Sequence, residues 1–382
     1  MKKLIIAFLV GAWAFNLSAQ DEKVSREPFQ ISMIPPLATS KISDTIIYNS
    51  SINVFAGYIY GLEGVEFGSL VNIVRQDAGY AQFAGLANLV GGKSTGIQAA
   101  GLANLDQKAE GVQMAGLVNA SQSFKGAQLA GLMNIAEKDT GNVQLAGMAN
   151  FTAGHIVGMQ GAGLINFSKT VDGAQVSGLI NAATEVEGTQ ISGLINYAKR
   201  VKGVQIGVIN VCDTIEDGLS IGVINVVRKG LHQFEVSSND VTDVNLSFRS
   251  GTNTFYGIFT SGIQTKSNPL WVYGMGFGTR FPVINDRFMT SIEATSSNVN
   301  RVEKSDFNHV NLLNNLSINL GYKLSKKVFI NAGPVLNVYV SNVKNSESGS
   351  YGYDIGKHNF FDHSSHGTNT RMWVGYRVGI WF

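Results

Sequence analysis

The sequence predicts an all-β protein in which a parallel β-solenoid of about eleven 14–16-residue repeats precedes an antiparallel β-barrel. Three observations lead to this prediction. A nine-residue phrase, in its fullest form Gly111 to Asn119, returns eleven times between Gly64 and Asn225. From Leu231 onward the repeat gives way to longer segments in which apolar and polar residues alternate, which is the period of a strand. The 382 residues include 44 glycines and 6 prolines, a composition that suits short strands with many tight turns.

Composition and charge exclude several classes of function. The formal net charge is +2 at pH 7, and charged residues make up 15% of the chain. No run of lysines and arginines occurs of the kind that follows a phosphate backbone. We therefore expect no nucleic-acid partner. The only cysteine, Cys212, lies within the repeats, which excludes an internal disulfide.

The N-terminus has the pattern of a secretory signal. Lys2 and Lys3 precede an apolar run from Leu4 to Phe15, and a small-residue site follows at 18–20. The run is shorter than the ~20 apolar residues that a spanning helix needs, so residues 1–20 are predicted to be a signal peptide and the mature protein to be exported. Residues 21–50 are polar and irregular, and we expect them to form an N-terminal leader.

Each repeat has the pattern of a strand. Its phrase has a period of two and is rich in valine and isoleucine, which favours a strand over a helix. The last position of the phrase is Asn in all eleven copies. Nine copies also carry a Gln earlier in the phrase, as Gln113 stands before Asn119, while Glu66 and Ser220 take the Gln position in the two terminal copies. If like residues stack, these amides form internal ladders that satisfy one another's hydrogen bonds. The residues predicted to form this structural ladder are Gln113, Asn119, Gln128, Asn134, Gln175, Asn181, Gln190 and Asn196.

Two architectures accommodate such repeats. Spanning strands of a larger barrel need about ten residues plus turns, which a repeat of this length supplies. An up-and-down barrel, however, alternates short turns with long loops, whereas the connections between these repeats are all alike. Several connections also carry an apolar residue five places after the Asn, as at Phe124 and Val171. Both features favour the solenoid, and the larger barrel remains the alternative.

Residues 231–382 have longer alternating segments. After the repeats, six strands are predicted at 241–249, 254–263, 271–282, 288–297, 312–324 and 328–341, and a last one at 371–382. In the last strand one face carries Met372, Val374, Tyr376, Val378, Ile380 and Phe382, and the other carries Arg371, Trp373, Arg377 and Trp381. One face suits lipid and the other a polar interior. The connections alternate between short and long, which is typical of outer-membrane barrels.

With its Gly-Leu-x-Asn phrases, such as Gly116-Leu117-Val118-Asn119, the chain resembles an uncharacterised family of Gram-negative surface-repeat proteins. The C-terminal part resembles an outer-membrane β-barrel, and the closing aromatic residue Phe382 resembles the C-terminal membrane signal of such barrels. The resemblance covers about residues 51–382 and implies a location in the cell envelope. It brings no established activity with it.

Two groups of residues are candidates for a chemical site. Gly274, Gly276 and Gly278 are spaced like the glycines of a phosphate-binding loop. No helix pattern follows them, however, and small residues facing a barrel interior explain them better. One polar loop holds His358, Asp362, His363 and His366, and the pair His363 and His366 could reach one metal. A mobile loop with chance histidines is the simpler interpretation. We expect no enzyme activity, no cofactor and no metal.

We therefore expect a non-enzymatic outer-membrane or cell-surface protein that presents a repetitive β-surface for binding or adhesion. The expected partners are outer-membrane lipid and a surface ligand or protein whose identity is unknown. The alternative is a porin-like barrel in which the repeats are spanning strands and small solutes pass.

The position of the repeats depends on which segment pairs with the strand at 241–249. A bacterial barrel has an even number of strands with both termini in the periplasm, so one upward strand must come first. If that strand is Ser51 to Tyr60, within the entry segment 51–63, the repeat region 64–230 is an insertion on the cell surface. If it is Leu231 to Ser237, the repeats precede the barrel region 231–382 and lie in the periplasm. Ser51 to Tyr60 has the better strand pattern, so we expect the surface.

Overall fold

The computed structural model describes residues 24–39, 45–138, 140–266, 268–284, 287–302, 309–325, 328–344, 351–356 and 358–382. The predicted signal peptide lies outside these ranges. The described residues form strands β1 to β28 and no helix, which confirms the all-β prediction. No helix in this part of the chain is long and apolar enough to span a membrane. The chain divides into two compact units, Met1–Gly203 and Val204–Phe382, so the division lies within the repeats.

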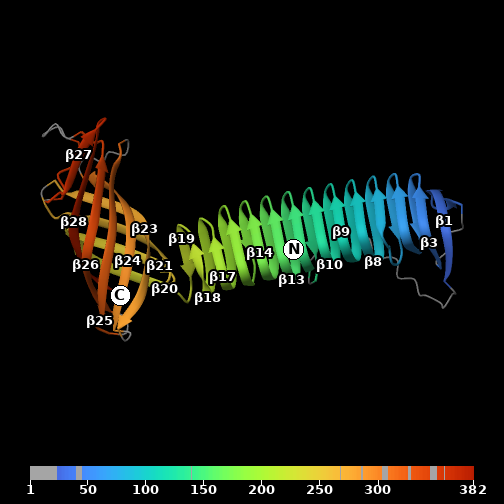
Figure 1. The fold of residues 1–382 in the computed structure, drawn as a ribbon, viewed down its shortest axis with the longest axis horizontal. Coiled ribbons are helices and arrows are strands. Elements are labelled where there is room, and N and C mark those ends of the chain that lie inside the picture. Colours follow the sequence, from blue (N-terminus) through green and yellow to red (C-terminus); the bar gives the residue numbers. More distant parts are fainter. Residues whose placement is uncertain are drawn as a thin grey trace. The chain divides into compact units, whose positions relative to one another are not determined.

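The repeats fold as a parallel β-solenoid of about 12 turns, and Figure 1 shows the stacked arrows of β8 to β14. Each turn pairs with the next in register, so that Asn119 lies opposite Asn104 and Asn134. The extra turn relative to the sequence prediction comes from residues 46–59, whose strands pair in parallel with the first repeat. The strands up to the unit boundary are β1 (Ser25–Ile34), β2 (Leu37–Ala38), β3 (Ile46–Asn53), β4 (Ala56–Ile59), β5 (Gly61–Gly68), β6 (Val71–Val74), β7 (Ala81–Ala84), β8 (Ala87–Ala100), β9 (Ala103–Ala115), β10 (Val118–Ala130), β11 (Met133–Ala136), β12 (Thr140–Ala146), β13 (Ala149–Ala162), β14 (Ile165–Ser177), β15 (Ile180–Ala182), β16 (Glu185–Ser192) and β17 (Ile195–Ile206).

Glycine opens most phrases for two physical reasons. Gly126 has a φ of 126°, a conformation that side chains rarely adopt. A Cβ atom at Gly126 would also lie 2.0 Å from the carbonyl oxygen of Gly111 in the preceding turn. The same two constraints act at Gly173 and Gly188. These glycines let successive turns stack directly on one another at the corner.

The apolar residue of the connecting segment also faces the core. Phe124, Val171 and Val201 are 0–3% exposed, as the solenoid interpretation predicts for a second core position. Ile215, in the last turns, is only partly buried. The parallel pairing excludes the alternative in which the repeats are antiparallel spanning strands.

The second unit contains a separate antiparallel sheet, drawn at the orange and red end of the colour scale in Figure 1. Its strands pair in chain order from β20 to β26, β26 then pairs with β28, and β28 pairs with β20 as well. The strands of this unit are β18 (Ile209–Ile221) and β19 (Ile224–Val227) of the repeats, then β20 (Leu231–Asn239), β21 (Val244–Gly251), β22 (Tyr256–Ile263), β23 (Leu270–Ile284), β24 (Phe288–Arg301), β25 (Asn311–Lys323), β26 (Phe329–Ser341), β27 (Phe361–Ser365) and β28 (Thr368–Trp381).

The structure corrects the expected partner of the second-unit strand β21. That partner is β20, which begins at Leu231. Ser51 to Tyr60 instead falls in β3 and β4, which belong to the solenoid. Ser51 to Tyr60 has the clearer strand pattern, but Leu231 to Ser237 belongs to a strand that continues to Asn239 with its alternation intact. Residues 51–60 therefore supply no strand to the second sheet, and the repeats are not an insertion between two of its strands.

Alternation in the second sheet agrees with the sequence prediction. In β28 the side chains of Val374, Tyr376 and Val378 are 53–65% exposed, whereas Trp373 and Trp381 are 1–2% exposed. The additional strand β27 was missed, because its residues Phe361–Ser365 were assigned to a polar loop.

Candidate functional site

The residues predicted as the structural ladder lie in the solenoid core in two rows of amides. All eight side chains are 0–2% exposed. In the Asn row, Asn119 Nδ2 donates to Asn134 Oδ1 at 3.0 Å, and Asn181 Nδ2 donates to Asn196 Oδ1 at 3.0 Å. In the Gln row, Gln128 Nε2 donates to Gln113 Oε1 at 2.7 Å, and Gln190 Nε2 donates to Gln175 Oε1 at 2.8 Å.

The two rows have opposite polarity. Each Asn donates to the Asn of the following turn, as Asn104 does to Asn119. Each Gln donates to the Gln of the preceding turn, as Gln113 does to Gln98. Amide dipoles that point in opposite directions along one core largely cancel, so partial charge does not accumulate towards either end.

The Asn side chains also bind the backbone at the corner of each turn. Asn119 Nδ2 donates to the carbonyl oxygen of Leu129 at 2.8 Å, and Asn134 Nδ2 donates to that of Leu145 at 2.8 Å. A primary amide supplies two donor hydrogens and one acceptor oxygen. Asn can therefore continue the row and satisfy a backbone carbonyl at the same time, which a hydroxyl with one donor hydrogen cannot do.

The Gln row ends at a carboxylate. Glu66, in the first repeat, accepts from Gln82 Nε2 at 2.9 Å and from Asn53 Nδ2 at 2.8 Å. Because every Gln donates towards the N-terminus, the terminal group needs only to accept, and an ionised carboxylate is acceptor-only. Asn53 also donates to Asn72, the first member of the Asn row. Burial raises the pKa of Glu66 above its usual value of 4.5, although hydrogen bonds from Gln82, Asn53 and Ser51 act to lower it.

A second buried acid lies beside the Gln row. Asp106 accepts from Ser94 Oγ at 2.5 Å and from the side-chain amides of Gln98 at 3.2 Å and Gln113 at 2.6 Å. The residue is 6% exposed, and burial raises the pKa of its carboxyl group from 3.8 to about 7 despite these three donors. Nothing in the repeat pattern marked Asp106, because the position varies between turns: it is Val90 in the preceding turn and Ser121 in the following one.

A shallow apolar groove runs along the outside of the solenoid in the first unit. It has a volume of about 1160 Å³. Its lining includes outward residues that follow the Gln residues, for example Phe83, Met114 and Leu145, and small residues such as Ala115 and Gly116. We call this feature the apolar groove. None of its lining residues is charged.

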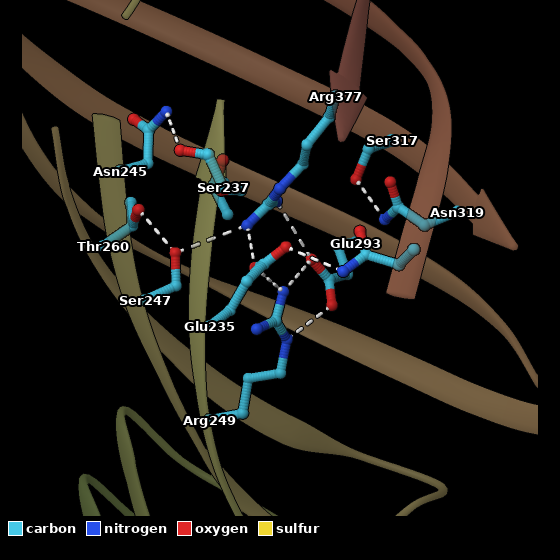
Figure 2. Close-up of polar contacts among 12 residues, drawn as sticks. Glu235, Ser237, Asn245, Ser247, Arg249, Thr260, Glu293, Ser317, Asn319 and Arg377 are labelled. Carbon is cyan, nitrogen blue, oxygen red and sulfur yellow. Dashed lines mark hydrogen bonds and ion pairs between the residues drawn. The ribbon is translucent and has the colours of Figure 1, made fainter. Parts of the chain in front are cut away.

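The antiparallel sheet of the second unit buries a network of four charged side chains, drawn in Figure 2. Arg249 donates to Glu293 from Nε at 2.7 Å and from Nη2 at 2.8 Å, and to Glu235 from Nη2 at 2.7 Å. Arg377 contacts the same two carboxylates. Both glutamates are 0–1% exposed, and each faces two arginines. The network is neutral as a whole, and its carboxylates are bound to arginines rather than free for acid–base chemistry.

The other end of this sheet is filled by apolar side chains. Tyr353 and Ile355, from the segment before β27, are 4–6% exposed and pack with Leu270, Val299 and Trp373. The backbone nitrogen of Tyr353 donates to the hydroxyl of Tyr339 at 2.9 Å. The inner side of the sheet is thus occupied by charged residues towards one end and by this cluster towards the other.

The residues that the sequence raised as chemical candidates do not form a site. Among the described residues no group of three or more His, Cys, Asp or Glu side chains could hold a metal. Asp362 Oδ2 instead lies 3.7 Å from Arg371 Nε. His366 Nδ1 forms a hydrogen bond with the hydroxyl of Ser365 at 2.8 Å. In β23 a Cβ atom at Gly278 would lie 2.5 Å from the ring of Tyr256, so this glycine makes room for a buried aromatic side chain. Phe382 is exposed, and its backbone forms hydrogen bonds with the backbone of Phe234.

Sequence reasoning missed the charge network. Its signal was present, because Glu235, Arg249, Glu293 and Arg377 each stand at the inward position of an alternating strand. The pattern shows that these residues face inward, but it does not show which of them meet.

The ladder can be tested in the middle of the solenoid. Asn119→Leu leaves the amides of Asn104 and Asn134 and the carbonyl of Leu129 without their partner, so we expect a loss of about 1–3 kcal/mol in the free energy of unfolding. Chemical denaturation followed by circular dichroism measures it. Lys125→Gln, on the exposed side of the same turn region, should stay within about 0.5 kcal/mol. Equal effects of the two substitutions would contradict the role of the ladder.

Asp106 should make the stability of the solenoid depend on pH. In the unfolded chain the carboxyl loses its proton near pH 3.8, whereas the folded chain keeps it up to about pH 7. The folded state therefore binds more protons in this window, and stability falls as the pH rises through it. Asp106→Asn should reduce the dependence of the melting temperature on pH between these values, and Lys125→Gln should retain the wild-type slope. An unchanged slope in Asp106→Asn would refute this assignment.

Removing one member of the buried charge network should destabilise the protein much more than removing one member of an exposed ion pair. Arg249→Met leaves two buried carboxylates to share Arg377, and breaking a buried pair in this way costs about 3–5 kcal/mol. We expect the folded form in detergent to be lost at a clearly lower temperature, as followed by gel mobility. Arg228→Gln is the control, because the side chain of Arg228 is 75% exposed in its pair with Asp213 and such pairs contribute little. A wild-type transition in Arg249→Met would count against the network.

Comparisons with known proteins give no relative: no protein-family model, no curated protein and no solved structure matches this chain.

Proposed function

We propose that the protein is a non-enzymatic outer-membrane protein in which the second sheet is a closed eight-stranded barrel that anchors the chain, and the solenoid presents a repetitive β-surface for binding. One observation carries the membrane anchor. The sheet turns a band of apolar side chains outward and buries the charges of its network, as with Val374 at 65% exposed and Arg249 at 1%. A soluble protein would expose the charges and bury the apolar residues, whereas a barrel in lipid has this distribution.

Strand pairing supports closure of the barrel. The pairing of β28 with both β26 and β20 leaves neither end of the series β20 to β28 as a free edge. In lipid every backbone polar group needs a partner within the protein, so a spanning sheet has to close on itself. The row of exposed apolar residues on β21, β24, β25 and β28 is the surface that would contact acyl chains.

The side of the membrane on which the repeats lie follows from the chain's entry into the sheet. The last repeat strand, β19, lies beside the turn between β21 and β22, where Ser250 Oγ donates to the carbonyl oxygen of Asn225 at 2.6 Å. The C-terminal Phe382 pairs with Phe234 near the same end. Short turns and both ends of such barrels are periplasmic. We therefore place the repeats in the periplasm, in place of the cell surface favoured by the sequence.

The porin-like alternative has no observation in its favour. The repeats are parallel, and the side chains of Arg249, Glu293 and Trp373 occupy the inner side of the sheet. An interior filled in this way suits an anchor better than a path for solutes.

Cysteine labelling of intact cells tests the anchor and the placement together. Ser364→Cys, in the exposed strand β27 on the long-loop side, should react with a membrane-impermeant maleimide in intact cells. Lys125→Cys, on an exposed position of the repeats, should react only after the outer membrane is permeabilised. The native Cys212 is buried and serves as the unlabelled background. Labelling of Lys125→Cys in intact cells would reject the periplasmic placement, and recovery of both variants in the soluble fraction would reject the anchor.

A further inference from the structure

Two parallel rows of apolar side chains run along the outside of the first unit's solenoid. The first row is the outward residue after each Gln, and each member lies in register with the next: Ile31, Ile52, Phe67, Phe83, Ala99, Met114, Leu129, Leu145, Gly161, Val176 and Ile191. The second row comes from the Gly-Leu-x-Asn phrases: Leu70, Leu86, Leu102, Leu117, Leu132, Met148, Leu164, Leu179 and Leu194, each 37–47% exposed. Together with the apolar groove these rows form what we call the apolar face.

The apolar face contains no charged residue. Exposed charges of the repeats pair between turns in the connecting segments, as Lys93 does with Glu110 at 2.7 Å and Arg200 with Glu185 at 2.7 Å. One side of the solenoid is therefore a solvated, ion-paired surface and another side is continuous apolar surface.

The area of this face matches what a stable interface needs. A large apolar side chain carries roughly 60–120 Å² of transferable area, so two rows of such side chains that are about two-fifths exposed present roughly 400–900 Å². The largest apolar patch on a typical monomer is about 300–600 Å². A standard interface buries about 800 Å² on each partner.

We propose that the apolar face pairs with the same face of a second copy of this chain. This deepens the binding role proposed above, on which it rests, by naming the partner. A face without charge offers no electrostatic feature for a partner of opposite sign, but it is complementary to itself. The first row lines the apolar groove, and a second copy brings the same row with the same ~4.8 Å repeat from turn to turn. A two-fold axis then places the first row of one copy along the first row of the other.

The sizes of the side chains along the first row favour an antiparallel register centred on Met114. In that register Phe67 of one copy lies opposite Gly161 of the other, and Ala99 lies opposite Leu129. Large side chains thus meet the two smallest members of the row. Leu145 would meet Phe83, and a charge at Leu145 would be buried against that ring.

The test uses the full chain in a mild non-ionic detergent, with sedimentation analysis over a range of protein concentrations. The wild type should sediment as a dimer. Leu145→Glu buries a charge in the interface, so its dimer should dissociate at a concentration roughly tenfold higher or more. Lys125→Glu introduces the same carboxylate on the ion-paired side and should remain dimeric. A second measurement links Met114→Cys with a short bis-maleimide in isolated membranes, where a dimer band is expected that Lys125→Cys does not give.

Two outcomes overturn the proposal. The first is a wild type that is monomeric at every concentration and gives no cross-link at position 114, and the second is a dimer that Leu145→Glu leaves unchanged. Phospholipid that co-purifies with a monomeric wild type and is lost in Leu145→Glu would assign the apolar face to lipid instead. Failure of pairing is distinguishable from failure of the proposed function, because membrane insertion and the side of labelling are measured on the same variants independently of their mass.

Discussion

The fold of the repeats depends on the requirement that every buried amide has a partner. An unpaired amide in the core costs the full desolvation of its donor and acceptor groups. In the middle of the solenoid each ladder Asn and Gln finds its partner in the equivalent residue of an adjacent turn, as Asn119 and Asn134 do at 3.0 Å. A shift of register by one residue would turn these amides outward and bring apolar side chains into the rows. The ladders therefore determine register, parallel orientation and the near-constant length of the repeat.

An interior filled by amides changes where apolar residues can go. The core of each turn has room for the Asn, the Gln, one small residue and one apolar residue from the connecting segment. Leucines such as Leu117 and the residue after each Gln, such as Met114, are left at the surface with 38–40% exposure. The exposed apolar face is thus a consequence of the ladder, and it gives the solenoid one side that is suited to burial against another surface.

The second sheet solves a similar problem with charges. Glu235 and Glu293 are buried, and two arginines neutralise them. The geometry of the pair formed by Arg249 and Glu293 is bidentate, which is the arrangement in which a guanidinium group interacts most strongly with a carboxylate. With its four buried charges paired internally, the sheet can present an apolar exterior. This property underlies its proposed role as a membrane anchor.

The sequence by itself determined the local architecture. Period-two alternation, the repeated phrase and the stacking of like residues were sufficient to predict parallel turns and to place Gln113 and Asn119 in adjacent rows, because a strict repeat imposes the same environment on equivalent residues. The inward and outward faces of β28 followed from alternation alone. Only the tertiary structure decided which distant strands pair. The choice of β20 over Ser51 to Tyr60 as the partner of β21, and the meeting of Arg249 with Glu293 and Glu235, depend on contacts between segments far apart in the chain, and alternation gives the face of a residue but carries no information about its partner.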